Sequence, residues 1–258
     1  MLRHLLALVC AILISGSALA QEGKKLTIRW YGQSFFQVTT SAGTRIVFDP
    51  HFIEQYPRDM VGADLVLITH PHADHSAMGR IINADKVKVL TGVKGTAKRQ
   101  EWNRIDEKFR DAHIYSIGTF HDKDSGATRG RNSCIIVEVD GLRICHLGDL
   151  GHELSERQLQ AIGDIDILMV PIGGIYTING TDAKKVVAQI KPKRLVLPMH
   201  YGTKAFEDLV GPDEFLDGLT NVQKLPNTNE IEVKLGEKPP KSPQIVLLGW
   251  TKKKPGDE

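Results

Sequence analysis

The sequence predicts an α+β fold in which β-sheets are covered by helices. Short runs rich in Val, Ile, Thr and aromatic residues recur along the chain, joined by turns or by single helical segments. This alternation is typical of sheets with helical covers. The chain has 258 residues, and we find no low-complexity segment and no linker long enough to divide it. We therefore expect one folded domain over residues 21–258.

The first twenty residues have the features of a secretory signal peptide. Arg3 and His4 precede an apolar run from Leu5 to Ile14, and small residues lead up to Ala20. The run is about half as long as the roughly twenty apolar residues that a membrane-spanning helix needs. We therefore expect cleavage after Ala20, export to the periplasm or the extracellular space, and no stable membrane insertion afterwards. A retained N-terminal anchor is the alternative.

The charge balance does not indicate a nucleic-acid partner. The chain contains 33 Lys and Arg against 31 Asp and Glu, for a formal net charge of +2. Basic residues gather at Lys252–Lys254, where a solvated tail explains them. We expect a small-molecule substrate, and the sequence leaves the oligomeric state open.

The first half of the chain is predicted to consist mainly of strands. Ser41-Ala42-Gly43 is a hairpin-type connection, and Pro71 ends the fourth strand because proline cannot donate to a ladder. Ser76 is a plausible N-cap for a helix to Ile82, and residues 96–102 read as a helix. The expected strands are 25–30, 34–39, 44–48, 64–69, 87–90 and 114–120.

The second half repeats the alternation of strands and helices. Asp140-Gly141 is a strong two-residue turn signal that joins strands 133–139 and 142–146. Ser155 begins a helix to Ile162, and Thr181 or Asp182 caps a helix to Ile190. The remaining expectations are strands at 166–170, 193–197, 231–235 and 245–249 and a mixed helical stretch at 206–219.

The two cysteines of the expected mature chain fall in the 133–146 hairpin. The turn would pair Ile136 with Cys145 and place Cys134 one diagonal step away. A disulfide there is geometrically awkward, so we expect two buried thiols, with a bridge as the alternative.

Four predicted strands end in side chains that bind divalent metals. Strand ends of a layered fold can converge on one edge, where ligand sites often lie. The strand over 64–69 runs directly into a loop with three histidines and an aspartate in six positions, although the chain has only ten histidines. The candidate ligands are His70, His72, Asp74, His75, His121, Asp149 and His200.

Five imidazoles and two carboxylates are too many for one tetrahedral zinc with an open position. They suit two metals roughly 3.5–4 Å apart that share a carboxylate. Burying such a cluster without metal would be costly. We therefore predict two divalent metal ions, with zinc favoured and manganese or iron as alternatives.

The spacing His70-x-His72-x-Asp74-His75, followed by His121, Gly148-Asp149 and His200, resembles the metallo-β-lactamase-fold hydrolase superfamily. The segments 30–34, 48–50, 146–149 and 198–202 are similar to its branch of ascorbate-6-phosphate lactonase-like proteins. The resemblance covers about residues 26–249. It implies a four-layer αββα sandwich with the metals at one edge.

The resemblance also implies an assignment of ligands. His70, His72 and His121 would hold the first metal, Asp74, His75 and His200 the second, and Asp149 would bridge them. His113 competes with His121, because the loop over 122–131 is unusual for the family. Diiron redox relatives place a glutamate where this chain has His72, which favours the hydrolytic branch.

The sequence therefore predicts an exported metal-dependent hydrolase. A hydroxide between the metals would attack an ester, lactone, amide or phosphodiester, and Asp74, the expected catalytic residue, would orient it. A phosphodiesterase or phospholipase-type hydrolase is one alternative, and a non-catalytic metal-dependent binding or sensing protein is another. Gly173–Thr177 is either pocket lining or a tight glycine turn.

Overall fold

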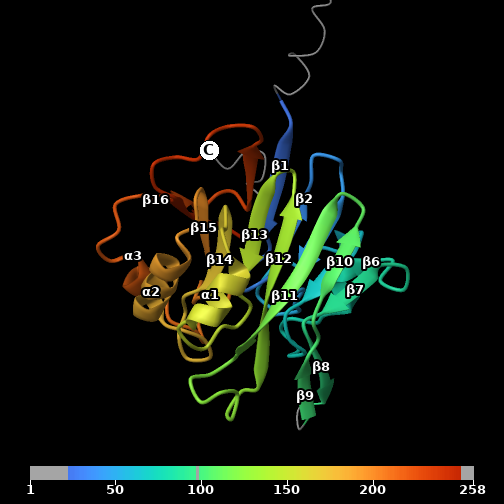
Figure 1. Ribbon diagram of the computed structural model, residues 1–258, viewed down its shortest axis with the longest axis horizontal. Coiled ribbons are helices and arrows are strands. Elements are labelled where there is room, and N and C mark those ends of the chain that lie inside the picture. Colours follow the sequence, from blue (N-terminus) through green and yellow to red (C-terminus); the bar gives the residue numbers. More distant parts are fainter. Residues whose placement is uncertain (1–22, 97–98, 251–258) are drawn as a thin grey trace, which may run out of the picture.

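Two β-sheets pack face to face around a common apolar core in this computed structural model, which describes residues 23–96 and 99–250 (Figure 1). The predicted signal peptide, residues 1–20, lies outside the described residues. Within the described ranges, no helix is both long and apolar enough to cross a membrane.

The six-stranded sheet is built mostly from the first half of the chain, in the order β17-β1-β2-β3-β5-β7. Its β1, β2 and β3 are antiparallel, and β3, β5 and β7 are parallel. The exception in sequence is β17, which comes from the C-terminal part and pairs antiparallel with β1. Its strands are β1 Lys25–Trp30, β2 Phe36–Thr39, β3 Arg45–Phe48, β5 Leu65–Ile68, β7 Lys88–Thr91 and β17 Glu230–Lys234.

The eight-stranded sheet has the order β10-β11-β12-β13-β14-β15-β18-β16. It is antiparallel from β10 to β13 and parallel from β13 to β16. Its strands are β10 Asp106–Phe109, β11 Ala112–Phe120, β12 Arg131–Val139, β13 Leu142–His146, β14 Ile167–Pro171, β15 Leu195–Met199, β16 Val222–Leu225 and β18 Gln244–Leu248.

Helices α1 (Glu156–Ile162), α2 (Gly180–Ile190) and α3 (Asp213–Leu216) cover the eight-stranded sheet. Helix α1 contacts β11 and α2, and α2 contacts β14 and α3, so the three form one group (Figure 1). The outer side of the six-stranded sheet carries shorter cover, namely the 3₁₀ helix η1 (Met78–Arg80) and the paired β4 (Val61–Gly62) and β6 (Ile81–Ile82).

Strand β5 is buried on both faces. Leu65 and Leu67 belong to the core between the sheets, whereas Val66 and Ile68 pack with Phe35 in a second core under the outer cover. This explains the continuous apolar run, because a parallel strand covered on both sides has no polar face. The rigid strand delivers His70 and the loop behind it to the edge of the sandwich.

The predicted helix over 96–102 is wrong at residues 96 and 99–102, and residues 97–98 lie outside the described residues. Strands β8 (Val93–Thr96) and β9 (Arg99–Trp102) pair antiparallel there. The Trp102 indole donates to the carbonyls of Thr119 and Asn132, and the Arg131 guanidinium lies 4.3 Å from the ring centre. These long-range contacts hold the segment extended and outweigh its local helical propensity.

The predicted helix over 76–82 contracts to the single turn η1. Ser76 does not cap it, because the Ser76 hydroxyl donates to the His72 carbonyl instead. The buried Arg80 guanidinium donates to the carbonyls of His51 and Asp59, which ties η1 to the loop before β4.

The other predicted helices differ mainly at their ends. Helix α1 has the capping box of Ser155 and Gln158. Asn179, rather than Thr181 or Asp182, caps α2. Of the stretch 206–219, only α3 is helical, and the short strands β10 and β16 were not predicted.

Cys134 and Cys145 are free and fully buried, and Ile136 pairs with Cys145 as the turn predicted. Burial raises the pKa of the Cys134 thiol to about 12.

In a chain that begins at Gln21, we expect both cysteine thiols to react with a thiol reagent in denaturant and neither to react in the native protein. A denatured, unreduced sample without reactive thiol would contradict the two-thiol state.

Candidate metal centre

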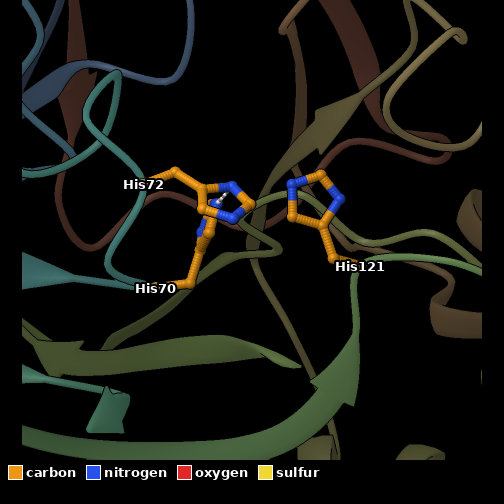
Figure 2. A group of neighbouring side chains, drawn as sticks. All are labelled: His70, His72 and His121. Atoms are coloured by element: carbon orange, nitrogen blue, oxygen red, sulfur yellow. Dashed lines mark hydrogen bonds between the residues drawn. The ribbon is translucent and has the colours of Figure 1, made fainter. Parts of the chain in front are cut away.

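Three histidines form the first group of candidate ligands. Figure 2 shows the rings of His70, His72 and His121 gathered together, with His70 and His72 on the loop after β5 and His121 directly after β11. Nε2 of His70 lies 3.0 Å from Nδ1 of His72. One ring nitrogen of each residue lies within 4.8 Å of the others, which is close enough to share a metal ion.

Asp149 stands at the centre of a second group, made of Asp74, His75, Asp149 and His200, whose ligand atoms also lie within 4.8 Å of one another. Its carboxylate also reaches the first group, because Oδ2 approaches four imidazoles from three separate segments, which follow β5, β11 and β15. Asp149 Oδ2 lies 3.2 Å from His75 Nε2, 3.1 Å from His200 Nε2, 3.0 Å from His121 Nε2 and 3.9 Å from His70 Nε2.

Several of these buried atoms have no hydrogen-bond partner among the described residues. They include Nε2 of His75 and Oδ1 of Asp149. A buried polar atom left unpaired costs about 1–3 kcal/mol, so such atoms need a partner of another kind. Imidazole nitrogens and carboxylate oxygens are ligands of zinc, manganese and iron, and the donor set therefore fits divalent metal ions.

Asp49, which follows β3, orients His70 of the first group and His75 of the second. Its buried carboxylate accepts from the Thr69 N–H at 2.8 Å, the Thr69 hydroxyl at 2.6 Å and His75 Nδ1 at 2.8 Å. The Thr69 hydroxyl has only one hydrogen, so it accepts from His70 Nδ1 at 3.0 Å. With both Nδ1 atoms protonated, the Nε2 lone pairs of His70 and His75 face the cluster.

Asn132 on β12 fixes the backbone at Asp149. Its side-chain oxygen accepts from the Asp149 N–H at 3.0 Å, while its amide nitrogen donates to the Thr119 hydroxyl and the Leu147 carbonyl at 2.8 Å each. Gly148 lies against this amide with φ of +56°, and a Cβ there would come within 2.3 Å of Asn132 Oδ1. Only glycine suits that position.

The protonation states of Asp149 and His75 depend on the oppositely charged side chains around each of them. Burial alone would raise the pKa of Asp149, but His200, His75 and His121 hold it well below the ordinary range. Burial alone would lower the pKa of His75, but Asp149, Asp74 and Asp49 raise it well above the ordinary value. Asp149 is therefore anionic, and a divalent cation at His75 Nε2 would replace a proton.

The structure places His121, and not His113, beside the other candidates. His113 is partly exposed on β11, with Nε2 2.6 Å from Asp106 Oδ1 and Nδ1 3.4 Å from Glu138 Oε2. Sequence reasoning missed Gln33 and Asn132 as contributors. Gln33 lies in the segment 30–34 that carried the resemblance, whereas nothing local distinguishes Asn132 from other strand residues.

Comparison with known proteins agrees with this geometry. A family model described as "Beta-lactamase superfamily domain" matches residues 27–200. A UPF0173 metal-dependent hydrolase of Pyrococcus abyssi is 30% identical over 215 residues, covering 71% of this chain and 92% of the relative. A UPF0173 metal-dependent hydrolase of Carboxydothermus hydrogenoformans is 30% identical over 198 residues, covering 69% and 85%.

The chain belongs to the metallo-β-lactamase superfamily, among the UPF0173 metal-dependent hydrolases. A solved structure from Thermotoga maritima, titled as a proposed zinc-dependent hydrolase of this superfamily, matches with a TM-score of 0.65 and 31% identity, covering 87% of this chain and 98% of the other. A proposed metal-dependent hydrolase from Parabacteroides distasonis matches with a TM-score of 0.55 and 25% identity, covering 79% and 94%.

The membership confirms the predicted metallo-β-lactamase fold. The lactonase-like branch stays a prediction, since the relatives named above are described only as metal-dependent hydrolases. The individual ligand roles likewise stay predictions, which the zinc content of variants can test.

We expect the wild-type protein to bind two zinc ions and His121→Ala to lose one of them on dialysis, because the substitution removes a nitrogen of the first group. The affinity should fall by more than the roughly 10–100-fold that losing an outer-sphere partner costs. His113→Ala is the control and should keep the wild-type zinc content by elemental analysis. Zinc loss in His113→Ala with retention in His121→Ala would reverse the assignment.

Proposed function

We propose that this UPF0173 hydrolase acts outside the cytoplasm as a two-metal enzyme that hydrolyses a small-molecule ester, lactone, amide or phosphodiester. Two groups of ligand atoms joined by one carboxylate oxygen, Asp149 Oδ2, support the proposal most directly. When bound, two divalent metals, zinc being favoured, would supply a hydroxide at neutral pH and polarise the scissile carbonyl or phosphoryl oxygen.

The protein's own residues divide the remaining work. His70, His72 and His121 would hold one metal, Asp74, His75 and His200 the other, and Asp149 would stay anionic between them. Asp74 differs from Asp149 in being 40% exposed at its side chain, against 3% for Asp149. It can therefore meet the reactants and accept a hydrogen bond from the attacking hydroxide, which orients it.

The loop that follows His121 is suited to form one side of a substrate site beside the candidate ligands. The buried Asp122 carboxylate accepts from the backbone N–H groups of Asp124, Gly126, Thr128 and Arg129 at 2.7–3.0 Å. Burial alone would raise the pKa of Asp122, but these bonds, that of Arg129 first, lower it. The hydrogen bonds to the Asp122 carboxylate thus fix the backbone of the loop over 122–130, which can form a rigid side of the substrate site.

Arg129 connects the loop over 122–130 to the loop between β14 and α2. Its guanidinium donates to the Ile175 carbonyl at 2.9 Å and lies 5.6 Å from the Tyr176 ring centre. In the same loop, the Gly173 N–H donates to the His200 carbonyl at 3.0 Å. Ile175 follows Gly173 by two residues, so the chain between them spans at most roughly 7 Å. Arg129, Ile175 and Tyr176 therefore form a rim that runs from the loop after His121 to the neighbourhood of His200.

The rim presents apolar surface to solvent. Ile175 is 53% and Tyr176 45% exposed, although large apolar side chains gain by burial. Ile175 also has φ of +55°, an unfavourable value for a β-branched residue. We infer that the non-reacting, apolar part of the substrate packs here. This favours the pocket-lining interpretation of Gly173–Thr177. The lactonase-like resemblance, rather than the rim, favours an ester or lactone as the reacting group.

The decisive experiment is a hydrolase panel of lactones, esters, amides and phosphodiesters, run on protein of measured metal content. We expect turnover that disappears on chelation, returns with zinc, and falls about 10²–10⁴-fold in kcat in Asp74→Asn. If metal-loaded protein hydrolysed nothing in the panel, the binding or sensing alternative would replace the enzyme. Export is checked separately, by an N-terminus at Gln21 in the secreted protein.

Tyr176→Ala should raise KM about 5–30-fold, the effect of losing roughly 1–2 kcal/mol of apolar contact, with kcat nearly unchanged. The KM increase should be larger for substrates with longer alkyl chains. Ile82→Ala, which removes an exposed apolar side chain on β6, is the control and should leave KM unchanged. An unchanged KM in Tyr176→Ala would place the substrate elsewhere.

A further inference from the structure

Gln33 touches two members of the second group with different parts of the residue. Its side-chain Nε2 donates to Asp74 Oδ2 at 3.4 Å. Its main-chain carbonyl accepts from the His200 N–H at 3.2 Å and from the Trp30 indole at 2.9 Å. Gln33 therefore connects Asp74 and His200, which come from segments far apart in the sequence.

The turn around Gln33 is held firmly. Tyr31 N–H donates to the Phe35 carbonyl at 2.9 Å, and Phe35 N–H to the Gly32 carbonyl at 3.0 Å. Gly32 has φ of +98°, and a Cβ there would come within 2.3 Å of the Tyr56 ring. Gln33 itself has φ of +50° and is 1% exposed. Such values are uncommon for non-glycine residues and cluster at functional sites.

The Gln33 amide is costly for folding alone. Its Oε1 is buried without a hydrogen-bond partner among the described residues, which costs free energy. A methionine of the same length would avoid that cost. The Gln33 amide therefore costs stability without being fully hydrogen-bonded in the fold, which indicates a role other than stability.

The Gln33 amide forms its side-chain hydrogen bond with Asp74. The Gln33 N–H is the one hydrogen bond to the Asp74 carboxylate that the structure shows within residues 23–96 and 99–250. The same oxygen, Oδ2, lies 3.6 Å from His75 Nε2. Asp49, by contrast, accepts three hydrogen bonds. Without Gln33, the partly exposed Asp74 side chain would be free to turn toward solvent.

We propose that Gln33 is a positioning residue for Asp74. Its amide holds Oδ2 toward the second group and leaves Oδ1 for the reactants, while its carbonyl fixes the backbone of His200. This inference rests on the proposed function, and its consequence is confined to the second group, since Gln33 contacts neither His70, His72 nor His121 through a hydrogen bond that the structure shows.

The test is a zinc titration of Gln33→Met by competition with a chromogenic chelator. We expect one of the two binding steps to lose about 10–100-fold in affinity while the other stays within about twofold, since only the second group loses its outer partner. Gln37→Met is the matched control. Gln37 is also buried, but its amide donates to the Gly62 carbonyl, and this variant should bind zinc as the wild type does.

A double-mutant cycle separates positioning from a merely structural effect. In an Asp74→Ala background, Gln33→Met should cost less than about threefold further in zinc affinity, because the carboxylate that the Gln33 amide holds is already gone. Additive losses, or a melting temperature much below that of Gln37→Met, would assign Gln33 a structural role and overturn the inference. With a substrate from the panel, kcat should fall and KM should stay unchanged.

The two proposals fail differently. If wild-type protein bound none of zinc, manganese and iron, the two-metal function would fail and the positioning role with it. If the wild type bound two zinc ions and Gln33→Met matched Gln37→Met in both binding steps, the function would stand and the Gln33 inference would be wrong.

Discussion

The convergence of four imidazoles on one oxygen, Asp149 Oδ2, is the constraint on which the arrangement of this hydrolase depends. The contributing side chains follow β5, β11 and β15, and Asp149 follows β13. These strands belong to both sheets, so the oxygen is reached from all sides only if the sheets pack in one register. A slip of one residue in any strand would turn its ligand to the other face.

A second network ties the sheets together behind the ligands. His146 on β13 contacts Phe48 on β3 in a stacked geometry, with ring centres 5.2 Å apart, and its Nε2 pairs with the Ser34 carbonyl at 2.9 Å. Phe48 precedes Asp49, whose carboxylate orients His75 and, through Thr69, His70. The apolar core and the polar centre are therefore continuous, and packing between the sheets fixes the directions of the ligand lone pairs.

Three residues at this centre have a left-handed backbone conformation. Gln33, Asp49 and His200 are non-glycine residues with φ of +50°, +43° and +50°. A left-handed conformation costs roughly 1–2 kcal/mol at such a residue, so the surrounding contacts must offset it. Each has them: the Trp30 indole at Gln33, Thr69 at Asp49, and the Gln33 carbonyl at the His200 backbone. The buried, hydrogen-bonded residues of the centre thus differ from Ile175 and Tyr176 of the rim, whose apolar side chains are exposed.

The sequence alone determined the local features of this protein. The strand before His70, the loop His70-x-His72-x-Asp74-His75, the Asp140-Gly141 turn and the Ser155 cap depend on residues close in sequence, so their patterns predict them. Tertiary structure decided what depends on distant partners. Residues 93–96 and 99–102 pair as antiparallel strands because Trp102 reaches β11 and β12. His121 rather than His113 joins the centre because its strand ends beside Asp149, and Gln33 meets Asp74 because a turn after β1 packs against the loop after β5. A contact between residues far apart leaves no periodicity or spacing in the chain, and only the packed sheets bring its two sides together.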